Sequence, residues 1–223
     1  MGYAFYNVDW AVCAPVVWAP SRRVLLHRDR IPRRGGFILA PNHLSPYDVP
    51  CLMLSTPRHL DFLSIVEMQG KPWVGPFFRG MNCVFVDRQR RDNPAAHAME
   101  GRLRRGRVIA MFPEGYIRLE EDSVIHGGKF RPGVVRLAQL AGVPILPCVV
   151  RGAGQFSKFK SWIPLKMWKH GINYGEPIHV PATGAQEAVD AALERLKTAY
   201  VALNGELEKA MNLKTITFSS TPQ

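Results

Sequence analysis

Cysteines are few in this sequence, and they lack the spacing of a disulfide framework or a zinc site. The four of them are scattered among mostly apolar neighbours, without a C-x-x-C pair, at Cys13, Cys51, Cys83 and Cys148. This usage is typical of reduced, buried thiols in a protein that faces the cytosol. The pair His43 and Asp48 has no third ligand at a recognisable spacing, so we expect no metal.

The sequence also lacks a dinucleotide fingerprint, an internal repeat and a low-complexity linker. Gly152-Ala153-Gly154 is not followed by the rest of such a fingerprint, so we expect no nucleotide cofactor. A chain of 223 residues without a linker can bury a full core and is most simply one domain.

Acidic residues are scarce. The sequence has 18 Asp and Glu against 29 Lys and Arg, which leaves a net charge of +11. This excess attracts polyanions: nucleic acid, an anionic membrane surface or a phosphorylated substrate. The arginines between residues 102 and 107 favour nucleic acid, but no aromatic–basic recognition motif accompanies them. We therefore expect anionic membrane lipid as a partner and no nucleic acid.

An apolar run long enough to span a bilayer is missing as well. The segment Tyr3–Pro20 is apolar and aromatic, but it contains Asp9 and we expect Pro15 to break it. It is also shorter than the about 20 residues that a spanning helix needs. A signal peptide would carry basic residues ahead of its apolar core, and none precede this one.

The same segment suits a membrane interface. Trp10 and Trp18 would sit at headgroup depth, and the arginines from Arg22 to Arg34 would meet lipid phosphate. We therefore assign residues 1–34 to an N-terminal membrane-interface segment of a peripheral or monotopic protein on the cytoplasmic face. The alternative is an ordinary N-terminal element packed on the core, with a solvated basic turn behind it.

Short apolar runs alternate with helix signals along the rest of the chain. Strands are expected at residues 36–40, 60–66, 83–86, 107–112 and 144–150, and helices from Ser45-Pro46, Asn93-Pro94 and Pro132. Residues 155–178 indicate hairpins or an extended flap, and apolar spacing predicts a long amphipathic helix over 185–211. This alternation predicts an α/β fold, with a mostly parallel central sheet and helices on both faces.

The residues after the first expected strand carry the clearest chemical signal. His43 and Asp48 lie five positions apart across a helix start. The carboxylate could hold the imidazole in one tautomer, and the imidazole could then take a proton from a hydroxyl. This is half of a catalytic triad without its nucleophile, which indicates that the substrate's own hydroxyl attacks. The alternative is a capping box, in which Ser45 and Asp48 only stabilise the helix N-terminus.

Three later stretches place charge at strand or helix ends, where ligands gather in such folds. Glu114, Gly115 and Arg118 put a carboxylate, a tight turn and a guanidinium after one strand. Arg88 ends another strand, and Lys129 precedes a helix N-terminus suited to anions. Each alone could be a surface ion pair or a basic loop. Together with the base–acid pair, these stretches favour a functional site, and their cations are suited to binding a phosphate.

The order of these stretches resembles the four signature blocks of the glycerolipid acyltransferases. The blocks are Asn42-His43-x-x-x-x-Asp48, the stretch ending at Arg88, Phe112-Pro113-Glu114-Gly115, and Val143-Pro144-Ile145-Leu146-Pro147. Within this family the chain looks most like the 1-acylglycerol-3-phosphate acyltransferases. The resemblance covers roughly residues 36–175, and it implies that residues 35–223 form an acyltransferase domain with the family's fold.

The resemblance implies that His43 is the general base and Asp48 its orienting partner. The acceptor would be a lysophospholipid, most simply 1-acylglycerol-3-phosphate giving phosphatidic acid, and the donor acyl-CoA or an acyl carrier protein thioester. No further cofactor is implied. The residues implied to contact the acceptor, chiefly its phosphate, are Asn42, Arg88, Glu114, Gly115, Arg118 and Lys129.

The chain departs from the family pattern in its third block. The family has Glu-Gly-Thr-Arg or Glu-Gly-Ser-Arg, whereas here Tyr116-Ile117 follows Gly115 and Arg118 arrives one position late. An acyltransferase for another lysolipid with the same base therefore stays open, as does a non-catalytic membrane-binding module. The sequence also leaves open which of Tyr116, Arg118 and Lys129 replaces the displaced arginine.

Overall fold

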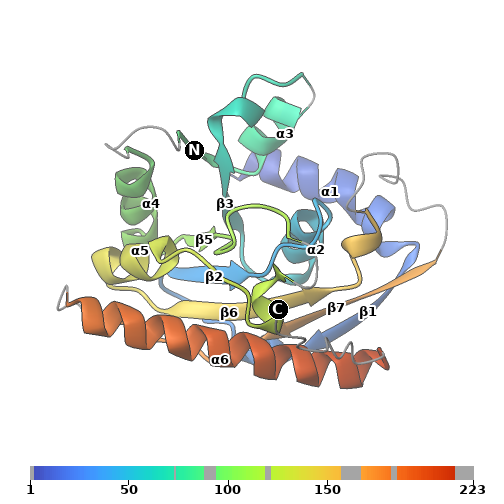
Figure 1. Cartoon of the computed structure of the whole chain (residues 1–223). Helices are drawn as coiled ribbons and strands as arrows, with labels where there is room; N and C mark the ends of the chain where they lie inside the picture. The colour runs from blue at the N-terminus through green and yellow to red at the C-terminus, as the bar shows by residue number, and fades with distance from the viewer. Residues whose placement is uncertain are drawn as a thin grey trace, which may run out of the picture.

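A mixed sheet forms the middle layer of the protein. The computed structural model describes residues 3–72, 74–87, 94–118, 122–156, 167–181 and 185–213. Within them the sheet has seven strands in the order β1-β7-β6-β2-β5-β3-β4 (Figure 1). Every neighbouring pair is parallel except β6 with β7, which confirms the mostly parallel sheet. The strands are β1 (Ser21–Leu26), β2 (Phe37–Pro41), β3 (Leu60–Ile65), β4 (Val84–Val86), β5 (Val108–Ala110), β6 (Ile145–Arg151) and β7 (Trp168–Tyr174).

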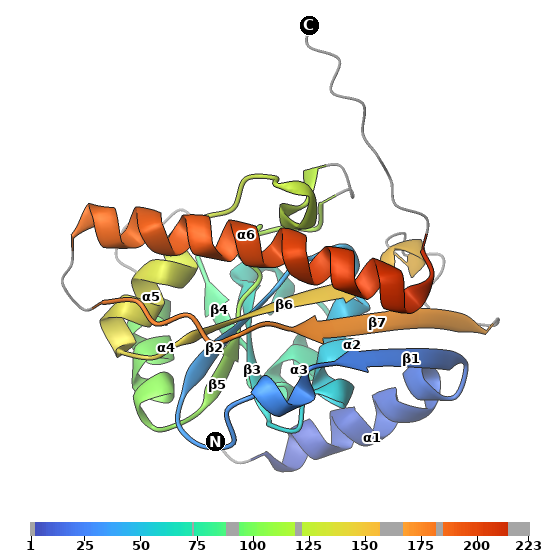
Figure 2. The same ribbon diagram turned by 90° about the horizontal axis from the view of Figure 1, so that it is seen from below.

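Helices cover both faces of the sheet, as the alternating pattern predicts. One side carries α1 (Ala4–Trp18), α2 (Asp48–Ser55) and α3 (Val74–Gly80). The other carries α4 (Pro94–Arg104), α5 (Gly133–Ala141) and α6 (Gln186–Met211). Figure 2 shows α6 and α1 on opposite sides of the strands. Short 3₁₀ turns occur at η1 (Arg28–Arg30), η2 (Val66–Met68), η4 (Val124–His126) and η5 (Gly154–Phe156).

Strand β2 lies at the centre of the core. Its alternate side chains enter two separate hydrophobic clusters, because successive residues of a strand point to opposite faces. Ile38 and Ala40 pack with α4, α5 and α6, and Phe37 and Leu39 pack with α1 and α2. All four side chains are fully buried. The loop that follows β2 therefore starts from one of the best-anchored points of the fold.

The N-terminal segment is one helix, and the break expected at Pro15 is wrong. A proline inside a helix costs about 3 kcal/mol because it removes one N–H donor and crowds the preceding turn. Here Tyr6 and Val17 are buried in the cluster that α1 shares with α2, and this packing holds the helix together. Among the described residues, no helix combines the length and the apolar character needed to cross a bilayer.

The arginine-rich segment behind α1 contains a strand that the sequence pattern does not predict. Strand β1 is the edge of the sheet and pairs in parallel with β7. Its Arg22 and Arg23 are exposed, so the strand lacks the apolar run by which buried strands are recognised. Strand β7 in turn is buried and antiparallel to β6. Part of the stretch 155–178 is thus a strand of the main sheet, while 157–166 lie outside the described residues.

A buried ion-pair network on β3 gives a test of the fold. Both carboxylate oxygens of fully buried Asp61 meet arginines: Oδ1 lies 2.6 Å from Arg107 Nη2, and Oδ2 lies 3.1 Å from Arg102 Nη1. We expect Asp61→Asn to lower the free energy of unfolding by about 3–5 kcal/mol, because two partly buried guanidinium groups lose their counter-charge. Urea unfolding followed by circular dichroism measures the change.

A matched control lies on the exposed side of α4. Glu100→Gln removes the 2.9 Å ion pair with Arg104, whose side chain is 59% exposed. We expect this variant to lose less than about 1 kcal/mol. Equal losses in Asp61→Asn and Glu100→Gln would contradict the special role of the buried pair.

Candidate active site

The loops after β2 and β5 lie side by side, because these two strands are parallel neighbours. Both loops leave the carboxyl edge of the sheet, which is where open α/β sheets bind ligands. A 2.9 Å hydrogen bond from the backbone N–H of Arg118 to the carbonyl oxygen of His43 joins the two loops. The third signature block is thereby held against the first.

The side chains of His43 and Asp48 meet, as the spacing predicts. His43 Nδ1 lies 3.1 Å from Asp48 Oδ2. The same oxygen accepts backbone hydrogen bonds from Leu44 (2.7 Å) and Ser45 (2.8 Å). The Asp48 side chain is fully buried, whereas that of His43 remains 16% exposed. The pair therefore presents the imidazole to a substrate and keeps the carboxylate away from solvent.

Helix α2 begins at Asp48, so the start predicted at Ser45-Pro46 is wrong. A residue before proline avoids the helical region, and Ser45-Pro46 forms the turn that leads into the helix instead. Ser45 Oγ accepts the backbone N–H of Tyr47 at 3.1 Å within this turn. Asp48 caps the turn and contacts the imidazole with a single oxygen, so the capping and orienting interpretations do not exclude one another.

The contact with Asp48 determines which ring nitrogen of His43 can act as a base. An ionised carboxylate only accepts hydrogen bonds, so Nδ1 carries the proton when the imidazole is neutral. Nε2 then holds the free lone pair. None of the described residues makes a hydrogen bond with His43 Nε2. This tautomer can accept a proton from a hydroxyl bound in front of the ring.

Residues after β5 fix the position of His43 from a second side. The Phe112 ring stacks on the imidazole, with 3.9 Å between ring centroids and 22° between the planes. Glu114 Oε2 accepts the backbone N–H of His43 at 2.8 Å. With Asp48 on Nδ1, the histidine is held at its ring face, its ring nitrogen and its backbone.

Glu114 is fully buried and faces the protein with both of its oxygens. Its Oε1 accepts hydrogen bonds from Ser123 Oγ (2.6 Å) and the backbone N–H of Val124 (2.8 Å). Burial raises the pKa of the Glu114 carboxyl above its ordinary value, although these donors and His43 oppose the rise. The geometry thus makes Glu114 a positioning residue that ties the His43 loop to the segment around η4.

Two arginines flank the turn that contains Gly115. This glycine has φ +78°, a left-handed conformation that side chains disfavour. A Cβ atom here would also lie 3.0 Å from Nε of Arg131, whose side chain packs on the turn. On the same turn, the Arg118 guanidinium lies 4.5 Å from the centre of the Tyr116 ring. Its Nε is buried without a hydrogen-bond partner among the described residues.

The remaining predicted substrate residues have different surroundings. The side chain of Asn42 is fully buried, and its amide exchanges hydrogen bonds of 3.1 and 2.7 Å with the backbone of Val150 on β6. Asn42 therefore joins the ends of two central strands. Lys129 is exposed in the segment before α5. Arg88 lies outside the described residues.

Arg131 and Phe112 are two neighbours of this site to which the sequence alone assigns no contact, although Phe112 belongs to the third block. Phe112 ends an apolar run that resembles the close of a strand, and nothing in the sequence places it over an imidazole. Arg131 follows Lys129 and Phe130 in a basic stretch, where the sequence draws attention to the lysine. The one signal in the sequence for the Arg131 contact is Gly115, because a glycine can mark a position where another group packs closely against the backbone.

Comparison with known proteins identifies the family of this chain. Residues 23–151 match the sequence model of the acyltransferase family. The match covers more than half of the chain and contains the whole of the described site. The chain therefore belongs to the acyltransferase family.

Two relatives and one solved structure are more specific. A probable 1-acyl-sn-glycerol-3-phosphate acyltransferase of Mycoplasma pneumoniae is 27% identical over 137 residues, which cover 58% of this chain and 49% of the relative. A protein of the same description from Mycoplasma genitalium is 29% identical over 157 residues, 67% of this chain and 55% of the relative. The chain thus spans about half the length of the curated relatives that it matches.

The solved structure is the 1-acyl-sn-glycerophosphate (LPA) acyltransferase PlsC from Thermotoga maritima. It superposes with a TM-score of 0.70 at 23% sequence identity and covers 90% of this chain and 80% of its own. At this identity the likeness shows a shared fold. The sheet and the helices that carry the His43 loop are therefore those of a known acyltransferase fold.

Proposed function

We propose that this protein transfers a fatty acyl chain from an acyl thioester to the free hydroxyl of 1-acylglycerol-3-phosphate, giving phosphatidic acid in phospholipid biosynthesis. The observation that carries the proposal is the imidazole of His43, held by Asp48 so that Nε2 is the free base. Family membership supports acyl transfer as the reaction. The descriptions of both relatives support the acceptor.

In the proposed reaction, His43 Nε2 takes the proton of the acceptor hydroxyl while the hydroxyl oxygen attacks the thioester carbonyl carbon. A C–O bond forms, the C–S bond breaks, and the departing thiolate recovers the proton from the imidazolium. Asp48 stabilises that imidazolium by its charge. The protein needs no acylated side chain, and the described residues bring no serine or cysteine into hydrogen-bond contact with the imidazole.

We assign the acceptor's phosphate to Arg118 and Arg131. A guanidinium offers two parallel donors to a phosphate, which suits it to this role better than a lysine. Both arginines flank the turn that also holds the backbone of His43 through Glu114. Neither side chain has an ion-pair partner among the described residues. Arg131 is thus our candidate for the residue that takes the role of the family's third-block arginine, and we expect Arg118 to bind the phosphate beside it.

Alanine substitution of these arginines should impair the use of the acceptor. We expect Arg131→Ala and Arg118→Ala each to lower kcat/KM for the lysophospholipid about 10- to 100-fold, because each loses a charge-assisted contact with the phosphate. The KM for the acyl donor should stay unchanged. Arg136→Ala is the matched control, since this arginine is exposed on α5. Equal effects of all three substitutions would contradict the assignment of the phosphate to Arg118 and Arg131.

We further propose that α1 rests in the interface of an anionic membrane. Its outward face carries Phe5, Val8, Val12 and Val16, whose exposed fractions are 75%, 58%, 63% and 42%. Asp9 does not interrupt this stripe, because its carboxylate packs against Gly80 of α3. Exposed apolar side chains on one helix face favour insertion among lipid headgroups. The free cysteines are consistent with attachment to a cytoplasmic face.

Incubation of detergent-purified protein with acyl donors and a panel of lysolipids tests the proposal. Mass spectrometry should detect phosphatidic acid from lysophosphatidic acid and long-chain acyl-CoA or an acyl carrier protein thioester. If only a different lysolipid gives product, the acyl-transfer mechanism stands but the acceptor is that lysolipid. This outcome would agree with the altered third block. The absence of product from every acceptor with either donor would favour a non-catalytic membrane-binding module.

A further inference from the structure

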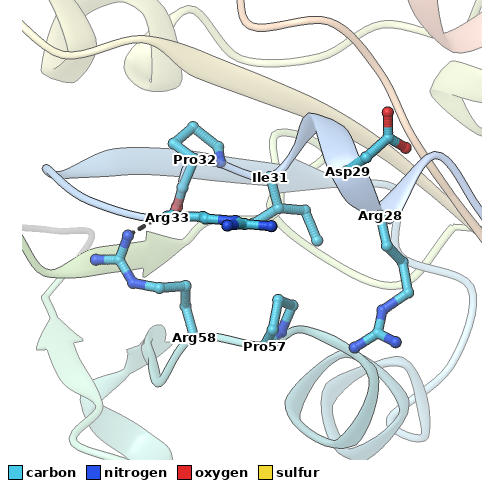
Figure 3. Close-up of a pocket in the computed structure, with 7 residues that line it drawn as sticks. All are labelled: Arg28, Asp29, Ile31, Pro32, Arg33, Pro57 and Arg58. Atoms are coloured by element: carbon cyan, nitrogen blue, oxygen red, sulfur yellow. Dashed lines mark hydrogen bonds between the residues drawn. The ribbon is translucent and has the colours of Figure 1, made fainter.

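A pocket of about 490 Å³ gathers arginine side chains at the edge of the sheet opposite to His43 (Figure 3). Its walls come from η1 and the chain that follows it, and from Pro57 and Arg58 just before β3. These segments lie at the amino ends of β2 and β3, whereas His43 follows the carboxyl end of β2. The five residues of β2 separate the two sites by on the order of 16 Å.

The pocket has an excess of positive charge. Arg28, Arg33 and Arg58 line it, and Asp29 is its one acidic lining residue. The Asp29 carboxylate points away from the three guanidinium groups in Figure 3. Arg28 and Arg33 are exposed, and no described carboxylate lies within ion-pair distance of them. Three cations that share one hollow repel each other unless an anion joins them.

The guanidinium of Arg58 is held in a fixed position in the pocket. It donates hydrogen bonds to three carbonyl oxygens, those of Pro32 (2.9 Å), Gly35 (3.1 Å) and Gly106 (2.8 Å). Carbonyl groups leave its full positive charge uncompensated, and they hold the group in one place. The pocket therefore presents one rigid cation and two adaptable ones, an arrangement suited to an oxyanion with several acceptor oxygens.

A second hollow of about 300 Å³ adjoins the first and shares Arg28, Pro57 and Arg58 with it. Its other lining residues include Tyr6 and Trp10 from α1 and are in part aromatic or apolar. The arginines of the first pocket therefore adjoin a partly apolar surface beside α1, the helix that we assign to the membrane interface. A ligand with an anionic group and an attached carbon skeleton fits this sequence of surfaces.

We propose that this pocket binds a phosphate ester group, as an anion site separate from the acceptor site beside His43. The ester belongs to a phospholipid headgroup of the bilayer or to a soluble organic phosphate, and the two sources share the same recognition chemistry. The site is spatially separate from His43, because its lining residues lie at the amino ends of β2 and β3.

The test compares two double variants that remove equal charge. Arg28→Ala/Arg33→Ala empties the pocket of its adaptable cations and leaves Arg58 with its carbonyl partners. Arg105→Ala/Arg136→Ala removes two exposed arginines from the region of α4 and α5. Flotation measures binding to vesicles of phosphatidylcholine alone and of phosphatidylcholine mixed equally with phosphatidylglycerol. Thermal unfolding with glycerol 3-phosphate at constant ionic strength measures the response to a soluble ester.

We expect the pocket variant to bind the anionic vesicles at least about tenfold more weakly than the wild type. The control variant should lose less than about threefold, and all proteins should bind neutral vesicles equally. Loss of the glycerol 3-phosphate response with unchanged vesicle binding would also support the site and assign it to a soluble ester. Equal losses in both variants, or no loss in either assay, would overturn the proposal, because the attraction would then be diffuse or absent.

Discussion

Replacement of His43 by alanine should lower kcat for acyl transfer about a thousandfold, with KM for both substrates changed only a few-fold. A positioned general base contributes about 10²- to 10⁴-fold to a rate, and His43 is the residue whose free Nε2 can supply it. The variant should fold, because the imidazole stacks on Phe112 at the surface of the core and is not itself fully buried. Steady-state kinetics with saturating acyl-CoA measure the effect.

The control for this substitution is His97→Ala on α4. The His97 side chain is 77% exposed, and we expect wild-type kinetics from its variant. If His43→Ala keeps full activity while its thermal stability is unchanged, the histidine is not the base. The interpretation of residues 43–48 as a helix-capping turn would then stand alone.

Asp48→Asn should lower kcat about a hundredfold and leave the fold intact. The carboxamide oxygen can still accept the backbone N–H groups of Leu44 and Ser45, which now bond to Oδ2. What is lost is the negative charge that stabilises the imidazolium after proton transfer, a change worth several kcal/mol in a buried site. The new NH₂ group would occupy the place of Oδ1, which is buried without a partner among the described residues.

Two further variants separate orientation of the base from capping. Asp48→Ala removes all the contacts of Oδ2 and should lower both kcat and the melting temperature. The double variant His43→Ala/Asp48→Asn should be no slower than His43→Ala alone, because Asp48 acts through the histidine and the two effects are not additive. A normal kcat in Asp48→Asn with a lowered melting temperature would mean that the carboxylate only caps the turn.

The parts of the fold that the sequence predicts are those encoded locally. Helix α5 begins directly after Pro132 and ends at Ala141, and the following Gly142 has a φ of +66° that suits the end of a helix. Strand β2, and strand β6 as far as Val150, are uninterrupted apolar runs because both of their faces are buried. The pair His43 and Asp48 was predictable for the same reason, since a short turn of fixed geometry joins them.

The parts that the sequence does not predict depend on distant partners. Strand β1 forms by pairing with β7, and its arginines interrupt the apolar run that would identify a strand in the sequence. The role of Glu114 depends on Ser123 and Val124, which reach its carboxylate through a separate turn. Arg131 packs on Gly115 from the segment before α5, at a distance in the sequence that no local pattern covers. No spacing rule in the sequence specifies these contacts.

The pairing of β1 with β7 has a consequence for how the protein is made. Ser21 stands opposite Trp168, so the sheet joins an early part of the chain to a late one. During synthesis α1 leaves the ribosome well before β7 exists, and its exposed apolar stripe can meet a bilayer first. Closure of the β1 edge then requires the most remote contact in the sheet, and long-range pairings of this kind form slowly. With α1 placed in a membrane interface as proposed above, we expect the nascent chain to reach the bilayer before the sheet is complete.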